Sequence, residues 1–210
     1  MIVVHTAMLR EFRLAPAAVA RVPTGARRRI RRVDAHIELM CDLLHHHHSG
    51  EDELLWPPLR TVLTAAGQAL LDEAEGQHAD IDRAIGDVQD ARRSWAQSVD
   101  EDSRTELCSA LHRLHHLLTT HLDAEERDLL PLAAAHLTPA QWAAVGHAGA
   151  AAVPKSKLLL VFGMFSYEGD PNVVSDMLCS APAAVRLTVP RLAPRVYAGY
   201  ARRIHGTARP

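Results

Sequence analysis

Aromatic residues are scarce in this chain, since Phe, Trp and Tyr together make up 4% of its 210 residues. Cysteine is rarer still. The three cysteines are odd in number and far apart, which argues against a disulfide framework or a zinc knuckle. No run of about 18 apolar residues is present, and the opening segment MIVVHTAMLREF already contains charged side chains, so we expect neither a membrane span nor a signal peptide. These absences together favour a cytoplasmic protein.

The chain also has no large excess of positive or negative charge. The formal net charge is −2 and the isoelectric point is about 6.7, so no overall basic field favours nucleic acid or a membrane surface as a partner. Hydrophobic residues make up 48% of the chain, enough for a buried core. Histidine is the exception in this ordinary composition, with 14 copies, and it indicates that imidazole groups serve a purpose here.

Five stretches of the chain are predicted to be helical. They cover residues 3–22, 27–65, 68–97 and 103–136, and a fifth starts at Thr138, where Thr-Pro-Ala-Gln places proline at the first helical position. Pro16 predicts a kink or a break in the first stretch, and Trp56-Pro57-Pro58 predicts an interruption in the second. Ser103, with Glu106 three residues later, has the spacing of a capping box and is the predicted N-cap of the fourth.

The chain changes character after residue 150. Five prolines, beginning at Pro154 and including Pro190 and Pro194, break the segment 153–210, which predicts short helices that wrap around the preceding ones. We therefore expect an all-α protein. It would comprise an up-down-up-down four-helix bundle over 1–150 and a helical C-terminal extension over 151–210 that covers the bundle.

Each of the first four helical stretches has an apolar stripe that advances by three or four residues, which is the period of one buried helix face. The stripes are His5, Met8, Phe12, Ala15 and Val19; Val33, Ile37, Met40, Leu44, His47, Glu51 and Leu54; Leu71, Ala74, His78, Ile81, Ile85 and Val88; and Leu107, Leu111, Leu114, Leu118, His121, Glu125, Leu129 and Leu132. The predicted core therefore contains histidine and glutamate side chains from four helices.

Two of these histidines precede a glutamate by four residues, in the pairs His47–Glu51 and His121–Glu125. This spacing places imidazole and carboxylate on one helix face, about 6 Å apart along the axis. A carboxylate that faces a bundle core costs several kcal/mol unless a partner neutralises it, and a bound cation does so. Four imidazoles with two carboxylates suit iron, manganese or zinc, and the ligand count implies two ions.

The helix order provides a geometric check on this set. His5 and His78 lie early in their helices and both His-x-x-x-Glu pairs lie late, so an up-down-up-down order brings all of them to the same end. His36 fails this check, because it precedes His47 by eleven residues, about 16 Å along the helix. The predicted metal ligands are His5, His47, Glu51, His78, His121 and Glu125.

At these residues the sequence resembles the hemerythrin-like, or HHE cation-binding, family. The motifs are HHSGEDELLWP around Glu51 and HLDAEERDLLP around Glu125, and the likeness covers roughly residues 1–150. The segments REFRLAP, HHHHSGED and HGTARP resemble an actinobacterial branch of that family with its own C-terminal extension. The resemblance implies two non-haem iron ions with oxo and carboxylate bridges. Glu51 and Glu125 would be the bridging carboxylates, and the four histidines of the predicted set would be terminal ligands.

The oxygen-carrying members of that family differ from this chain in two helices. Their third helix has a His-x-x-x-His pair where this chain has Ala74 and His78, and their fourth has Asp five residues after His where this chain has Glu126. One imidazole is therefore missing from the pattern. The shorter ligand set implies more open coordination positions, and with them reaction with peroxide, oxygen or nitric oxide rather than simple oxygen carriage.

The sequence leaves the roles of several other residues undecided. His48 is a further candidate ligand or neighbour of the site, and Asp82, one turn after His78, is either within reach of the centre or an ordinary edge carboxylate. Tyr197 or Tyr200 either covers the bundle or serves as a hydrogen-bond donor or radical sink at the ions. The tryptophans are expected as core anchors, and the remaining histidines of helices 27–65 and 103–136 as surface or interhelix residues; they are Trp56, Trp95, Trp142, His45, His46, His112, His115, His116 and His136.

These features lead to one main functional hypothesis and two alternatives. The main hypothesis is a di-iron oxidoreductase that reacts with small oxidants and decomposes hydrogen peroxide in a catalase-like cycle, with a role in oxidative stress. The first alternative is a sensor or binding protein, without turnover, in which oxygen, nitric oxide or iron changes the conformation of residues 150–210. The second is a mononuclear or zinc-bound structural site.

Overall fold

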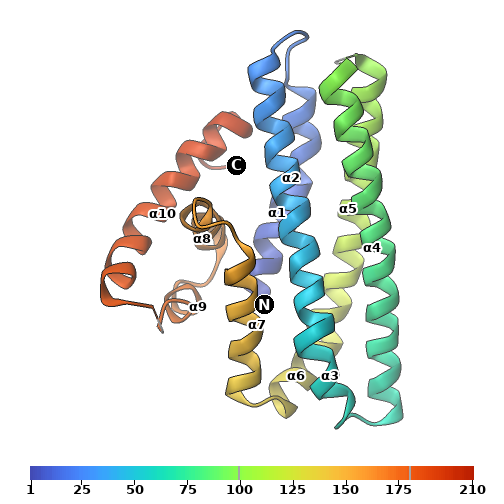
Figure 1. Ribbon diagram of the computed structural model, residues 1–210, viewed down its shortest axis with the longest axis vertical. Helices are drawn as coiled ribbons and strands as arrows, with labels where there is room; N and C mark the ends of the chain where they lie inside the picture. Colours follow the sequence, from blue (N-terminus) through green and yellow to red (C-terminus); the bar gives the residue numbers. More distant parts are fainter. Residues whose placement is uncertain (99, 180) are drawn as a thin grey trace.

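The computed structural model describes residues 1–98, 100–179 and 181–210, and every regular element within these ranges is a helix. Four long helices lie side by side along the longest axis of the molecule (Figure 1). They are α1 (Ile2–Ala20), α2 (Arg27–Gly50), α4 (Ala65–Ser98) and α5 (Glu101–Ala124). Short connections make successive helices antiparallel, so the predicted all-α bundle is confirmed.

A π-helical turn follows α2 and another follows α5. The turn η1 (Glu51–Leu55) continues into α3 (Trp56–Arg60), and η2 (Glu125–Leu129) continues into α6 (Leu130–His136). Each π turn begins at the glutamate of a His-x-x-x-Glu pair, and a proline is the second residue of the helix after it. Proline has no N–H with which to continue the α-helical pattern, and π turns often mark functional sites in helices.

The π turns change which residues face the core. Leu54 and Leu132, predicted on the buried stripes, are only half-buried, whereas Leu55 and Ala133 are 0% and 1% exposed. The prediction was wrong because it continued both stripes with a step of three. Around each π turn the buried positions are instead spaced by four, from Glu51 to Leu55 and onward in α3, because a π turn contains more residues than an α turn.

The hydrophobic core has two parts. The larger cluster fills the bundle and includes Met8, Leu44, Ile81 and Leu118. The smaller cluster, which includes Leu55, Trp56, Leu71 and Leu129, lies beyond the two π turns. The buried histidine and glutamate side chains of the predicted set come from the chain segments between these clusters, so a polar layer separates two apolar ones.

Four further helices follow the bundle and lie on one side of it (Figure 1). They are α7 (Pro139–Ala152), α8 (Leu158–Glu168), α9 (Pro171–Asp176) and α10 (Ala183–Ile204). The start of α7 confirms the prediction at Thr138, whose side chain and that of Gln141 form a capping box. Helix α7 packs on α2 and η1, and α8 packs between α1 and α10. At Gly163 of α8 an added Cβ would lie 2.3 Å from the carbonyl oxygen of Ala193, so glycine allows the close approach of α10.

Two local predictions about helices were wrong, those at the C-terminal prolines and at the N-cap of α5. Helix α1 runs without a break through Pro16, and α10 runs through Pro190 and Pro194. The prolines of α10 are exposed, where water can bind the carbonyl groups that they leave free. The N-cap of α5 is Asp100 rather than Ser103: its side chain accepts a hydrogen bond from the Ser103 N–H at 2.8 Å.

The tryptophan prediction holds for two of three residues. Trp56 and Trp95 are fully buried, whereas Trp142 is 40% exposed. Trp142 lies on α7, of which no residue is buried, because α7 covers the bundle without being covered itself.

Candidate metal centre

The six side chains predicted as metal ligands meet in the polar layer of the bundle. Each of the four long helices, or the π turn that continues it, contributes at least one of them. They are His5 from α1, His47 and Glu51 from α2 and η1, His78 from α4, and His121 and Glu125 from α5 and η2. Five of the six are at most 3% exposed, and the His47 side chain is 9% exposed. The helix-level argument from the sequence therefore selected residues that the fold brings together.

Their donor atoms form two groups that could each hold a cation. His5, His47, Glu51 and Glu125 form one group, and His48, Glu51, His78 and His121 form the other, with the donor atoms of each group within 4.8 Å of one another. Glu51 belongs to both groups, which is the arrangement of a bridging carboxylate.

The two glutamates face both groups. One oxygen of Glu51 lies 3.3 Å from His47 Nε2 and the other lies 3.6 Å from His78 Nε2. Glu125 Oε2 lies 3.7 Å from both His5 Nε2 and His121 Nε2. Each carboxylate therefore lies within 3.7 Å of imidazoles of both groups.

His48 belongs to this centre although the sequence favoured His47 alone. It is 2% exposed, its ring is stacked on that of His78 with a centroid distance of 4.2 Å, and it meets His121 edge-on at 5.0 Å. The signal that pointed to it is its spacing of three from Glu51, which also places two side chains on one helix face. With His48 the centre offers five imidazoles, so the imidazole missing at Ala74 has a counterpart on α2.

Many of these buried donor atoms have no hydrogen-bond partner. They are Nε2 of His5 and His47, both ring nitrogens of His48, and both carboxylate oxygens of Glu51 and of Glu125. Buried polar atoms are almost always paired, because an unpaired one costs about 1–3 kcal/mol. A set of imidazole nitrogens and carboxylate oxygens that face one another without partners fits the donor set of transition-metal cations.

The opposite ring nitrogens of three histidines do have partners. His5 Nδ1 lies 2.8 Å from Glu126 Oε1, His78 Nδ1 lies 2.8 Å from Asp52 Oδ1, and His121 Nδ1 lies 2.9 Å from Gln77 Oε1. An N–H donated from Nδ1 leaves the lone pair of Nε2 free and directed into the centre. Metal-binding histidines are commonly oriented in this way.

Burial shifts the pKa values of the centre in opposite directions. It raises the pKa of Glu51 well above its usual value, reinforced by the Glu125 carboxylate, and it also raises the pKa of Glu125. Burial, reinforced by neighbouring imidazoles, lowers the pKa of His47 and His48 well below the usual range. His47 and His48 are thus neutral, as metal binding requires, and a cation would favour the ionised form of both carboxyl groups.

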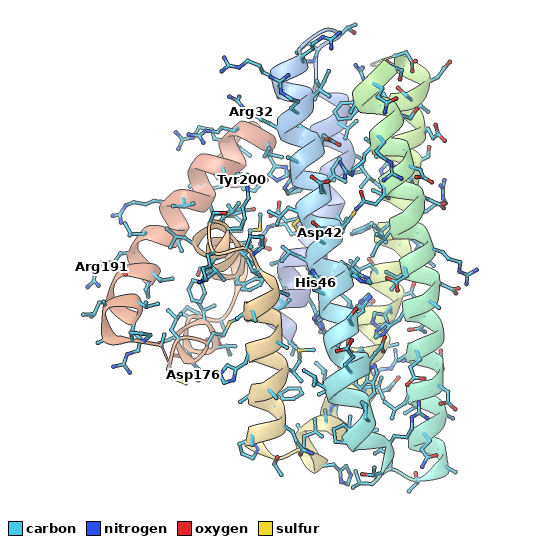
Figure 2. All side chains as sticks on the ribbon, viewed as in Figure 1. Arg32, Asp42, His46, Asp176, Arg191 and Tyr200 are labelled. Carbon is cyan, nitrogen blue, oxygen red and sulfur yellow. The ribbon has the colours of Figure 1, made fainter. Side chains whose placement is uncertain are left out.

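Three candidates from the sequence lie outside the centre. Asp82 is exposed and pairs with the exposed His45 at 3.3 Å, because it extends from the outer face of α4. Tyr197 and Tyr200, which the sequence left open as groups at the ions, have other partners: their hydroxyl groups bind Glu11 and His36. Figure 2 shows Tyr200 on α10 facing the bundle in the half of the molecule that holds the start of α2. His36, which the helix-level check excluded from the ligand set, also lies outside the centre, because its Nε2 faces Glu11 of α1.

No curated protein and no solved structure matches the chain. Within the described residues, none of the helices combines the length and apolarity that crossing a membrane requires.

The family model of the hemerythrin HHE cation binding domain matches residues 1–133. That match includes all six predicted ligands, His48 and both π turns, and it ends before α7. Because the match covers more than half of the chain and every residue of the candidate centre, the chain belongs to the hemerythrin HHE cation-binding family.

Proposed function

We propose that this protein binds two iron ions in the polar layer and decomposes hydrogen peroxide to oxygen and water. Membership of the family makes it a cation-binding helical domain. The observation that carries the proposal of two ions is the sharing of Glu51, whose two carboxylate oxygens have no hydrogen-bond partner, between two groups of buried donors. Iron, when bound, supplies a redox couple that can both take electrons from one peroxide molecule and give them to another.

The chain's own residues fix the positions of the donors before any ion binds. Glu126, Asp52 and Gln77 each hold one imidazole through its Nδ1, and the helix backbone fixes the His-x-x-x-Glu pairs. The apolar clusters lie on either side of the layer and shield the donors from bulk water at those two faces. Donors held in place in this way would need little rearrangement when an ion binds.

A small cavity lies beside this layer. It has a volume of about 50 Å³ and is lined by residues of α4, α5 and η2, including Gln77, Glu125 and Asp128. About 10–15 Å³ accommodates one water molecule, so the cavity holds a few water-sized molecules. This size suits hydrogen peroxide, oxygen and nitric oxide.

The two donor groups differ in their number of imidazoles. The first contains His5 and His47, whereas the second contains His48, His78 and His121. Each group has four protein donors, but in the first group a carboxylate, Glu125, takes the place of the third imidazole. Because Glu125 also lines the cavity, we place the reaction with the oxidant at the side of His5 and His47.

Oxygen evolution from hydrogen peroxide by the iron-loaded protein tests this proposal. We expect two iron ions per chain and continuous oxygen release, with both lost in Glu51→Ala and His121→Ala. His46→Ala, at an exposed neighbour of the site on α2, is the matched control and should retain both. The zinc-loaded protein should release no oxygen, because zinc has no redox chemistry. If peroxide only bleaches the iron-loaded protein without turnover, the catalase-like reaction is excluded.

A second candidate function is reversible binding or sensing of oxygen or nitric oxide. His48 is the observation that favours it, because a fifth imidazole brings the donor set closer to that of a carrier than the sequence indicated. A spectral change that reverses when oxygen or nitric oxide is removed, without consumption of peroxide, would support this function over the first.

A further inference from the structure

A second buried cluster of metal-type donors lies between the bundle and the C-terminal helices. It consists of Glu11 on α1, His36 on α2 and His205 directly after α10. Their exposed fractions are 0%, 0% and 3%. His36 and His47 are eleven residues apart on α2, about 16 Å, so this cluster is separate from the centre described above. His205 also lies outside residues 1–133 matched by the family model.

The three donor atoms already have the spacing of ligands to one ion. Glu11 Oε2 lies 2.9 Å from His205 Nε2 and 3.5 Å from His36 Nε2. With metal–ligand bonds of about 2.1 Å, neighbouring ligands are about 3.0 Å apart in an octahedral site and about 3.4 Å apart in a tetrahedral one. The two imidazole rings lie nearly at right angles, at 85°, with centroids 5.3 Å apart, so both converge on the same carboxylate oxygen.

Neighbouring residues leave this oxygen free for the two histidines. The other oxygen of Glu11 accepts hydrogen bonds from the Tyr197 hydroxyl at 2.6 Å and from Arg10 Nε at 3.0 Å. His36 Nδ1 lies 3.1 Å from the Tyr200 hydroxyl, whereas its buried Nε2, which faces Glu11, has no hydrogen-bond partner. His36 and Glu11 thus have partners on the side away from the cluster, as is typical of protein metal ligands, whereas His205 Nδ1 is buried without one.

Arg10 helps to fix the position of Glu11. Its guanidinium pairs with Glu11 at 3.0 Å and with the exposed Glu168 at 3.0 Å. These contacts hold the Glu11 carboxylate with one oxygen toward the two histidines.

The fold fixes His205 in place. Helix α10 ends at Ile204, and Gly206 has a φ of +79°, a left-handed conformation that glycine adopts without strain at helix C-termini. The chain turns away directly after His205, while the close contact at Gly163 fixes α10 against α8. Three segments that are distant in the sequence thus bring rigidly held donors to one point.

We propose that Glu11, His36 and His205 form a separate mononuclear site for a divalent transition metal of the zinc type, and that this ion fastens the C-terminal extension to the bundle. Two histidines with one glutamate are a known zinc ligand set, and the same types of donor bind iron(II). The proposal is independent of the proposed reaction with peroxide, because it concerns other residues and requires no turnover.

Zinc alone is the probe for this site. The full-length protein is stripped with a chelator, loaded with zinc, freed of excess metal and analysed for zinc content. We expect one equivalent more than the bundle centre holds. Glu11→Gln and His205→Gln should each lose that one equivalent, and the control His45→Gln, at an exposed histidine, should lose none. Glu125→Gln should lose zinc from the bundle centre and retain the equivalent at His205.

Anomalous diffraction at the zinc edge, on crystals of the loaded wild-type protein, provides a readout that does not depend on how a variant folds. A peak between Glu11, His36 and His205 is expected, in addition to those in the bundle centre. If the crystals show zinc only in the bundle centre, or if His205→Gln retains the zinc content of the wild type, the cluster is a metal-free hydrogen-bond network and the proposal is wrong.

Discussion

The Nδ1 atom of His78 lies 2.8 Å from a carboxylate oxygen of Asp52, the residue that directly follows Glu51 in the chain. The same relationship joins His5 to Glu126, the residue after Glu125, also at 2.8 Å. Each His-x-x-x-Glu motif is thus extended by an acidic residue that orients a histidine on a different helix. The two halves of the centre repeat one another in this detail.

Removal of the Asp52 carboxylate should therefore weaken iron binding without unfolding the protein. In Asp52→Ala we expect iron affinity about 10–100-fold below that of the wild type, because His78 loses the group that fixes its tautomer and orientation. Competition with a chelator of known affinity measures the change. Glu53→Ala, at the adjacent exposed position, is the control. Equal affinity in Asp52→Ala and Glu53→Ala would show that Asp52 does not orient His78.

Replacement of His48 tests whether the fifth imidazole binds metal. We expect His48→Ala to lower the iron content or to change the absorption and Mössbauer spectra of the bound iron, because one of three imidazoles in its donor group is lost. His46→Ala, two residues away and exposed, should leave content and spectra unchanged. Unchanged spectra in both variants would leave His48 with a packing role only.

Chelation of the metal should destabilise the protein. Without a cation, Glu51 and Glu125 face each other in the core with no hydrogen-bond partner at any of their carboxylate oxygens. A ligand at 1,000 times its Kd contributes about 4 kcal/mol, which corresponds to a rise in Tm of roughly 10 °C for a chain of this size. Calorimetry of the iron-loaded and metal-free protein measures this difference.

The variant Glu51→Gln separates the metal effect from general loosening of the fold. The amide is uncharged, so metal-free Glu51→Gln should melt no lower than the metal-free wild type, and added iron should raise its Tm less. A metal-free Tm far below that of the wild type would mean that Glu51 stabilises the fold without a cation.

The register change at η1 predicts unequal effects of two adjacent leucines. Leu55 is fully buried, so Leu55→Ala should cost about 2–5 kcal/mol of unfolding free energy. Leu54 is half-buried, and Leu54→Ala should cost less than half as much. Denaturant titrations of the two variants, both loaded with metal, compare them directly. A larger loss at Leu54 would contradict the register that the π turn sets.

Cysteine reactivity should follow burial. Burial raises the pKa of the Cys41 thiol to about 12, so only about one molecule in a thousand carries the thiolate at pH 9. We expect a thiol reagent to modify the exposed Cys179 rapidly and to leave Cys41 unmodified between pH 7 and 9 unless the protein is unfolded. Mass spectrometry of peptides after timed labelling identifies the modified residues. Labelling of Cys41 at the rate of Cys179 would show that the bundle opens near Cys41.

The sequence alone determined the class of fold and six of the seven side chains that meet in the main centre. Periodic leucines in four stretches require buried helix faces, and a histidine or glutamate in such a stripe has to enter the core. This reasoning selected His5, Glu51 and the other four predicted residues, because spacing along a helix fixes both direction and height. Metal content, number of ions and reaction remain proposals.

Only the tertiary structure decided the features that depend on several segments at once. The side chain of His48 could be placed only once His78 of α4 was beside it, and the π turns shifted the buried positions beyond Glu51 in a way that α-helical periodicity does not describe. The contacts of Tyr197 and Tyr200 and the meeting of Glu11, His36 and His205 depend on how α10 docks on α1 and α2. Docking is set by the packing of surfaces far apart in the chain, such as Gly163 against Ala193, and local spacing contains no information about it.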